Sequence, residues 1–482
     1  MADVEYYKLL SLEDVAHYLA NANADTRQNI ITSVMMTTVI VHDKSIYFLD
    51  VVNRYFKKIS DYSNVNLASL VSQFVGVSLT VLNKEDAGAL KRVGEKYPKD
   101  YAKLVSYKCA DVGSFKLKMS LPEGLQFNVD LGGIHFINGR FDLASGTFNA
   151  RSIPTLTEPR SLISEVLPYE WSESHPDSEA AFRLIISRLF ANTDELEYVL
   201  FVLGGALRGD VSGCSCMFHV GRGSNGKTAL LRFVSAALSL YSQELPSNVF
   251  DSRTVANRVL SEVRPTSRFL IVHELNKNKK DASAIKSVCD GQIVTTKLYK
   301  GGAFTIPING KLFCTTNNII AFDDDDGGIA RRVQYCVHSN IFTTDPTLVN
   351  NVNVFAAVMY QYDTMSNENR LAIFNVLRRY ATDEFITRVG TNYVIPQSIK
   401  TSDSIMDIVA FLRVYYVCEV DGTVSKATVV AHAAQYFIGM EYSEELLIGK
   451  ICKCEAINKI VYDKHRTLEA GSKGVFVNMR LI

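Results

Sequence analysis

The pattern of hydrophobic and polar positions predicts an α/β centre within a longer chain. Short apolar runs between polar turns predict buried strands at 214–220, 268–274, 302–308, 311–316 and 331–337. Apolar residues spaced by three and four predict two helices within 175–209 and another after residue 228. Because predicted strands alternate with predicted helices, the pattern favours an α/β fold with a mainly parallel sheet.

The parts on either side of this centre show other patterns. Residues 1–110 mix helical periodicity with short β segments, whereas 131–153 read as β segments whose Asn138-Gly139 and Ser145-Gly146 turns supply positive φ angles. The chain turns helical after 346, and its last eighty or so residues end in β after helices. We therefore expect an N-terminal mixed helical region at 1–110, an accessory β-containing domain at 111–174, the α/β domain at 175–345, a helical connector at 346–400 and a winged-helix-like module at 401–482.

Length and charge limit the classes of protein that fit. A chain of 482 residues is too long for a single hydrophobic core. Its 51 basic and 51 acidic residues cancel in charge, which argues against a protein that coats nucleic acid through bulk charge. Nine scattered cysteines without zinc spacing indicate reduced thiols. An acidic N-terminus and apolar runs shorter than the roughly 20 residues of a membrane span predict a soluble intracellular protein with no membrane partner.

The strongest motif is "GRGSNGKT", which matches G-x-x-x-x-G-K-[ST] between a predicted strand and a predicted helix. Glycines there let backbone N–H groups close around phosphate oxygens, and the helix N-terminus favours negative charge. Lys227 is expected to contact the β and γ phosphates, and the Thr228 hydroxyl to ligate Mg²⁺. ATP and Mg²⁺ are therefore the expected cofactors, bound by Gly221, Arg222, Gly223, Ser224, Asn225, Gly226, Lys227 and Thr228.

Two polar residues follow the next central strands. Glu274 ends the apolar run "RFLIVHE" and is the expected catalytic base and second Mg²⁺ residue, although a strand-end acid facing solvent is the alternative. His273 stands where many such ATPases carry another acid, and it reads as a packing or sensing residue. Asn317 follows "KLFCTT" and is expected to orient the attacking water beside the γ phosphate.

Arg331 and Arg332 follow at the start of the last predicted strand. A guanidinium placed against the γ phosphate stabilises the transition state and is often supplied by a neighbouring subunit, so the pair predicts a homo-oligomer. The alternative is an arginine pair in surface salt bridges with Asp323 to Asp326.

Taken in order, "GRGSNGKT", "FLIVHE", "GQIVTTKLYKGGAF", "KLFCTTNN" and "GGIARRV" resemble the superfamily III helicases, and specifically their poxvirus-type primase-helicase group. "FINGRFDLASGTF" is similar to a block in the accessory domain of that family, so the resemblance covers about 130–482. It implies an AAA+-like ring ATPase, a hexamer in the similar proteins, acting where viral or plasmid DNA is replicated. No primase motif is visible in this chain.

The same resemblance implies a DNA-binding hairpin between the acid strand and the asparagine strand. In this chain the segment reads "DGQIVTTKLYKGG" at 290–302, and Lys297, Tyr299 and Lys300 fall on the family's basic and aromatic positions. Lysines there would neutralise phosphates, and the tyrosine could stack or pack beneath the turn. Gln292 stands where the family has an acid.

The expected function is that of an ATP-dependent replicative DNA helicase that tracks single-stranded DNA and opens forks, with 3′ to 5′ polarity implied by the resemblance. A primase, a polymerase or other replication proteins are the expected partners. Two alternatives stay open. One is a P-loop ATPase that loads or remodels a replication protein, and the other is a DNA-binding module whose ATP site is regulatory.

Overall fold

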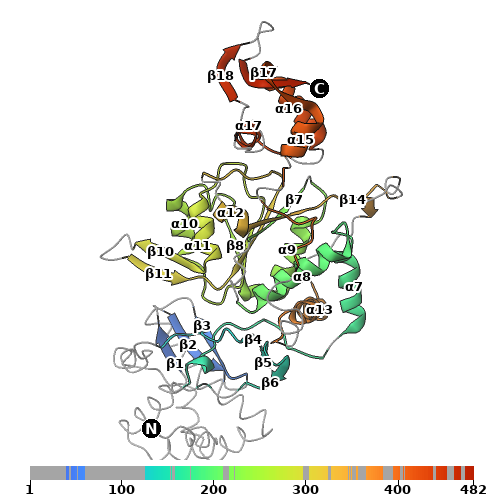
Figure 1. Cartoon of the computed structure of the whole chain (residues 1–482). Coiled ribbons are helices and arrows are strands. Elements are labelled where there is room, and N and C mark those ends of the chain that lie inside the picture. Colours follow the sequence, from blue (N-terminus) through green and yellow to red (C-terminus); the bar gives the residue numbers. More distant parts are fainter. Residues whose placement is uncertain are drawn as a thin grey trace, which may run out of the picture. The chain divides into compact units, whose positions relative to one another are not determined.

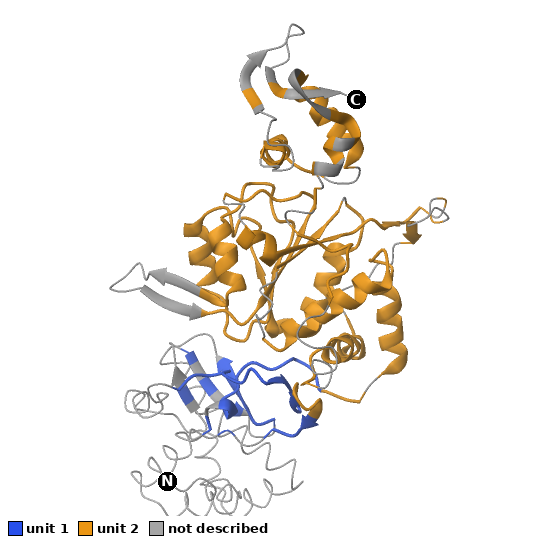
Figure 2. Ribbon diagram, in the orientation of Figure 1, with its two compact units in different colours: residues 1–141, 148–170 blue, residues 142–147, 171–482 orange. Residues whose placement is uncertain are grey.

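The computed structural model falls into two compact units, residues 1–141 with 148–170 and residues 142–147 with 171–482 (Figure 2). The finer five-part division stays a prediction. The structure describes residues 39–42, 45–50, 53–59, 125–151, 154, 158–173, 175–209, 216–221, 223–296, 303–323, 327–345, 347, 349, 354–356, 365–383, 394–401, 405–406, 408–437, 441–452, 461–467 and 473–481.

The first unit contains two small sheets. Strands β1 (Val39–His42), β2 (Ser45–Asp50) and β3 (Tyr55–Ile59) form an antiparallel sheet, and β4 (Gly133–Phe136), β5 (Gly139–Asp142) and β6 (Thr147–Asn149) form the second. A short 3₁₀ helix covers Pro159–Ser161. The buried guanidinium of Arg151 donates to the carbonyl of Gly139 at 3.0 Å and also to those of Phe136 and Asn53. One arginine thus satisfies backbone carbonyl groups beside the first sheet and within the second.

The two predicted turns of the accessory region differ in chemistry. Gly146 has φ +71°, as a tight turn requires. The expectation of positive φ at Asn138-Gly139 is wrong, because neither residue adopts it. Gly139 is needed for space instead: a Cβ there would lie 2.4 Å from Cζ of Phe148.

The second unit is built on a six-stranded sheet in the order β16-β13-β7-β12-β9-β8 (Figure 1). All neighbours are parallel except β16 with β13, which confirms the expected mainly parallel α/β sheet. Its strands are β7 (Cys216–Val220), β8 (Ser242–Leu245), β9 (Phe269–Val272), β12 (Lys311–Thr316), β13 (Val333–Val337) and β16 (Lys400–Thr401). The helices around it are α7 (Pro176–Ser187), α8 (Thr193–Leu207), α9 (Lys227–Leu238), α10 (Arg253–Leu260), α11 (Ala282–Cys289), α12 (Gly327–Arg332) and α13 (Asn367–Arg378), with 3₁₀ helix η3 at Ser239–Tyr241.

Helices cover both faces of this sheet. Figure 1 shows α10, α11 and α12 on one side and α8 and α9 on the other. Side chains on one face of the sheet, such as Phe218 of β7 and Cys314 of β12, belong to the core that includes Ile285 of α11. Both residues are fully buried. Double coverage explains why the strands read as continuous apolar runs.

An antiparallel hairpin projects beside α11 (Figure 1), made of β10 (Gln292–Thr296) and β11 (Ala303–Pro307). Its register pairs Thr296 with Ala303. The tip lies outside the described residues, and with it the three predicted DNA contacts, Lys297, Tyr299 and Lys300. Two further short strands, β14 (Ile341–Thr343) and β15 (Val354–Ala356), pair in parallel.

The C-terminal segment runs helix, strand, helix, helix, strand, strand. It comprises α15 (Ile408–Tyr415), β17 (Tyr416–Ser425), α16 (Lys426–Tyr436), α17 (Glu444–Cys452), β18 (Val461–Thr467) and β19 (Lys473–Leu481). Its strands form an antiparallel sheet in the order β17-β19-β18. Within the described residues, no helix combines the length and the apolar character that a bilayer crossing requires.

Candidate nucleotide site

The loop Gly221–Thr228 joins β7 to α9, as the motif predicts. Gly226 caps the helix with φ +77°, and a Cβ there would lie 2.3 Å from Cδ2 of Leu189. A Cβ on Gly221 would lie 2.1 Å from Nδ2 of Asn225. The fixed glycines of the motif are therefore required by this backbone path. Gly223, at a variable position of the motif, is exposed, and a Cβ on it would have open space within 4 Å.

The Lys227 side chain is only 6% exposed and folds back into this loop. Its Nζ donates to the carbonyl of Gly221 at 2.8 Å and to Oδ1 of Asn225 at 3.3 Å. Burial lowers the pKa of Lys227, while the carboxylates of Glu274 and Glu441 act to raise it. A buried ammonium with neutral acceptors beside it is suited to an anionic ligand.

The rest of the loop is held by backbone contacts. Asn225 is buried, and its Nδ2 donates to the carbonyl of His338 at 3.3 Å. Ser224 is exposed with φ +61°, and its carbonyl accepts from the amide of Phe342 at 2.7 Å. Thr228 is half-buried in the first turn of α9. Arg222 lies outside the described residues.

Glu274 follows β9 closely and is exposed. Its backbone has φ +52°, in the left-handed region that a residue with a Cβ rarely adopts. The amide of Glu274 donates to Oγ1 of Thr315 on β12 at 2.9 Å, and the amide of Leu275 donates to the Thr315 carbonyl at 2.7 Å. Strand β12 thus holds the backbone at Glu274 in a conformation in which the chain turns away from the direction of β9.

Asn317 follows β12 directly and is exposed. Strand β12 lies between β7 and β9, so the phosphate loop, Asn317 and Glu274 leave the carboxyl ends of three adjacent parallel strands. The amide of Gly221 donates to the carbonyl of Thr316 at 3.3 Å, which links the loop to the asparagine strand. Ligands of open α/β sheets bind beyond the carboxyl ends of the strands, where these predicted residues gather.

The two predicted arginines have different surroundings. Both end helix α12, although the strand pattern predicted them at the start of β13. Arg332 forms an ion pair with Asp290, Nη2 to Oδ1 at 2.7 Å, at the base of the β10–β11 hairpin. Arg331 is exposed, and its Nε donates to the carbonyl of Gly327 at 3.1 Å. Of the two, Arg331 has the guanidinium better placed to reach another molecule.

His273 is half-buried beside Glu244 of β8, with Nε2 and Oε1 3.6 Å apart. Burial lowers the pKa of His273, and Glu244 acts against that shift. The ring therefore lies beside the neighbouring strand, and its interpretation as a packing or sensing residue stays a prediction.

One acidic residue near the loop was not predicted from the sequence. Glu441 precedes α17, and its carbonyl accepts from the amide of Ile319 at 2.7 Å, just after Asn317 and Asn318. Its carboxylate acts on the pKa of Lys227. No local motif marks Glu441, because it meets the site only through a contact between distant segments.

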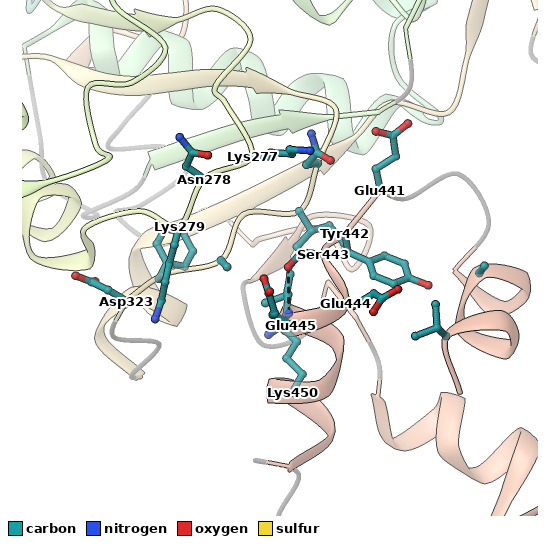
Figure 3. A pocket seen from close by; sticks show the side chains of 18 residues that line it. Lys277, Asn278, Lys279, Asp323, Glu441, Tyr442, Ser443, Glu444, Glu445 and Lys450 are labelled. Atoms are coloured by element: carbon teal, nitrogen blue, oxygen red, sulfur yellow. Dashed lines mark hydrogen bonds between the residues drawn. The ribbon is translucent and has the colours of Figure 1, made fainter. Parts of the chain in front are cut away.

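A cavity of about 1080 Å³ adjoins this contact (Figure 3). One side carries Lys277, Asn278, Lys279 and Asp323 from the loops after β9 and β12, and the other carries Glu441, Tyr442, Ser443, Glu444, Glu445 and Lys450. Both signs of charge line it. The cavity shares Asn318 and Glu441 with the edge that carries Asn317.

Comparisons with known proteins give a distant likeness. No family model matches the chain, and no curated protein matches it. Three solved structures of the C-terminal region of NrS-1, two of them described as the A form, match with TM-scores of 0.39, 0.40 and 0.38 at 11%, 10% and 11% identity. Each match covers 93% of this chain and 98% of the other.

Proposed function

We propose that this chain is an ATP-dependent DNA helicase that works as a ring of identical subunits. The observation that carries the proposal is the gathering of the Gly221–Thr228 loop, Asn317 and Glu274 at the carboxyl ends of β7, β12 and β9. Nucleotide hydrolysis needs a phosphate cradle, a group that orients water and a base, and these residues supply one of each.

The described residues fit a nucleoside triphosphate. A Cβ added at Gly221 would clash with the loop, and one added at Gly226 would clash with Leu189. Only glycine at these positions therefore lets the loop keep the conformation in which its amides are accessible to phosphate. The first amides of α9 have no partner within the helix and favour a negative charge. Thr228 and Glu274 would hold Mg²⁺, which would neutralise charge on the phosphates when bound.

The protein groups then have separate roles. The Lys227 ammonium binds phosphate oxygens in place of its present acceptors, the Gly221 carbonyl and the Asn225 amide oxygen. Asn317 orients a water molecule through its side-chain amide. Glu274 accepts the proton of that water. The hydrogen bond to Thr315 holds the Glu274 backbone in its left-handed conformation and so sets the point from which the side chain extends.

Coupling to DNA rests on the β10–β11 hairpin. The Arg332–Asp290 ion pair connects helix α12 to the hairpin base, so a change at α12 is transmitted to the segment that carries Lys297, Tyr299 and Lys300. Arg331, exposed on the same helix, is the residue we assign to the site of an adjacent subunit. The assignment of the hairpin to DNA comes from the family resemblance and stays a proposal.

The test compares the wild type with Lys227→Ala and Lys300→Ala in assays of ATP turnover, with and without single-stranded DNA, and of unwinding of a forked duplex. We expect no turnover by Lys227→Ala, and basal turnover without DNA stimulation or unwinding by Lys300→Ala. Stimulation by a replication protein but not by DNA would support the loader alternative instead. ATP binding without turnover by the wild type would support the regulatory alternative.

A further inference from the structure

Three potential metal ligands meet beneath the phosphate loop, outside the residues assigned to ATP. His219 lies on β7 and Cys336 on β13, and the parallel register pairs their Cα positions. Partners in register point to the same face of a sheet. The amide of His338 donates to the carbonyl of Val220 at 2.8 Å, which continues the ladder, so His338, two residues after Cys336, lies on that face too.

Their donor atoms converge in a dry environment. His219, Cys336 and His338 are 0%, 1% and 4% exposed, and one ligand atom of each lies within 4.8 Å of the others. Ligands around a tetrahedral zinc ion are separated by about 3.3–3.6 Å, given zinc–nitrogen and zinc–sulfur bonds of about 2.0 and 2.3 Å. Small side-chain rotations would therefore bring this set to a bonding geometry.

The hydrogen bonds fix which nitrogen of His338 is available. Its Nδ1 lies 3.0 Å from the carbonyl of Leu189, which can only accept, so Nδ1 carries the hydrogen. With its hydrogen on Nδ1, the neutral ring has its lone pair at Nε2. A ligating histidine commonly donates its other N–H to a backbone carbonyl in this way.

The His219 ring supplies the second nitrogen. Its Nδ1 lies 2.9 Å from Nε2 of His338, and its Nε2 is buried without a hydrogen-bond partner among the described residues. Because Nε2 of His338 carries no hydrogen, Nδ1 of His219 donates to it. An ion bound between these two nitrogens would take the place of that hydrogen, which would move to Nε2 of His219.

Charges of both signs act on the three ligands, because the Lys227 ammonium acts on both imidazoles and the Glu195 carboxylate acts on Cys336. The buried carboxylate of Glu195 lies close to Cys336. When a divalent ion binds, the thiol releases its proton to solvent, and the thiolate and Glu195 together balance the added charge.

We propose that His219, Cys336 and His338 bind a thiophilic ion of the Zn²⁺ class beneath the phosphate loop. Two imidazoles and a thiolate suit zinc and exclude the hard ion Mg²⁺. The ion would join β7 to β13 where the loop begins. Since the His338 carbonyl accepts from Asn225, it would also stiffen the loop around Lys227.

The test measures metal content by mass spectrometry in the full chain, purified without chelator and then equilibrated with one equivalent of Zn²⁺. Cys336→Ser is compared with the matched control Cys314→Ser, a fully buried thiol on β12, the strand on the other side of β7. We expect about one ion per chain in the wild type and the control, and at least a tenfold loss of affinity in Cys336→Ser. Equal metal in both variants would overturn the proposal.

A second measurement does not depend on how any variant folds. The wild type depleted of metal and titrated with Co²⁺ should show a thiolate-to-cobalt charge-transfer band that persists in excess Mg²⁺ and ATP. Absence of this band, or its loss when Mg²⁺ is added, would contradict the proposal, the latter because the ion would then belong to the nucleotide site.

Discussion

The amide of Glu274 donates a hydrogen bond to Oγ1 of Thr315 at 2.9 Å, across from one parallel strand to the next. Thr315 is fully buried, whereas Glu274 is exposed at the carboxyl edge of the sheet. A core hydroxyl thus holds the backbone of the proposed catalytic base, with φ +52°, in place. The backbone position of the proposed base therefore depends on a buried residue of the neighbouring strand.

Replacing that hydroxyl tests this positioning role. We expect Thr315→Val to lower kcat for ATP by roughly 10-fold to 100-fold with little change in KM, because a displaced base affects the chemical step more than binding. Thr315→Ser keeps the oxygen and should restore most of the rate. Steady-state kinetics of the two variants are the measurement, and equal kcat values for them would contradict the role.

Strands β7, β9, β12 and β13 of the central sheet were predictable from the sequence for a physical reason, whereas β8 and β16 were not predicted and the predicted strand at 302–308 is β11 of the hairpin. Parallel strands covered on both faces must be apolar along their length, and "KLFCTT" coincides with β12 at Lys311–Thr316. The ends of those strands then place Glu274 and Asn317. Arg331 and Arg332 were predicted within a strand because α12 is short and begins with two glycines, which are poor helix formers.

Other contacts could not be read from the sequence. Glu441 reaches the site through a backbone bond to Ile319, and nothing local to either residue indicates that pairing. The nine cysteines show no zinc spacing, yet the register of β7 with β13 brings Cys336 beside His219. Strand order and register depend on packing among distant segments, and the amino-acid pattern of one segment does not specify its neighbour.

Substitutions of the neighbouring residues Arg331 and Arg332 should have different effects. Arg331→Ala should lower ATP turnover by about 10³-fold or more if this guanidinium acts on an adjacent subunit. Adding Lys227→Ala subunits, which keep Arg331, should then restore part of the turnover through mixed rings. Failure of mixed rings to recover any activity would contradict action between subunits.

The Arg332–Asp290 ion pair should instead affect coupling to DNA. We expect Arg332→Ala and Asp290→Ala to retain basal ATP turnover but to lose stimulation by single-stranded DNA. The double variant should be no worse than either single one, since both changes break one contact. Additive losses in the DNA-stimulated rate would show that the two residues act separately.

The environment of Lys227 predicts how ATP binding depends on pH. Burial lowers the pKa of this lysine, and phosphate binding needs its charged form, so affinity should fall as pH rises through that lowered value. Glu441 acts to raise the pKa, so Glu441→Gln should shift the fall in affinity to lower pH. Titration of a fluorescent ATP analogue from neutral to alkaline pH measures the shift, with Glu444→Gln as the control, and a shift to higher pH would contradict the assigned contact.

The central proposal is that one edge of the sheet both binds ATP and hydrolyses it. The most direct measurement is ATP binding and turnover by Glu274→Gln beside the wild type, in the presence of Mg²⁺ and single-stranded DNA. We predict unchanged affinity for ATP with turnover reduced by roughly 10²-fold to 10⁴-fold, the usual contribution of a general base. Turnover by Glu274→Gln at the wild-type rate would contradict the proposal.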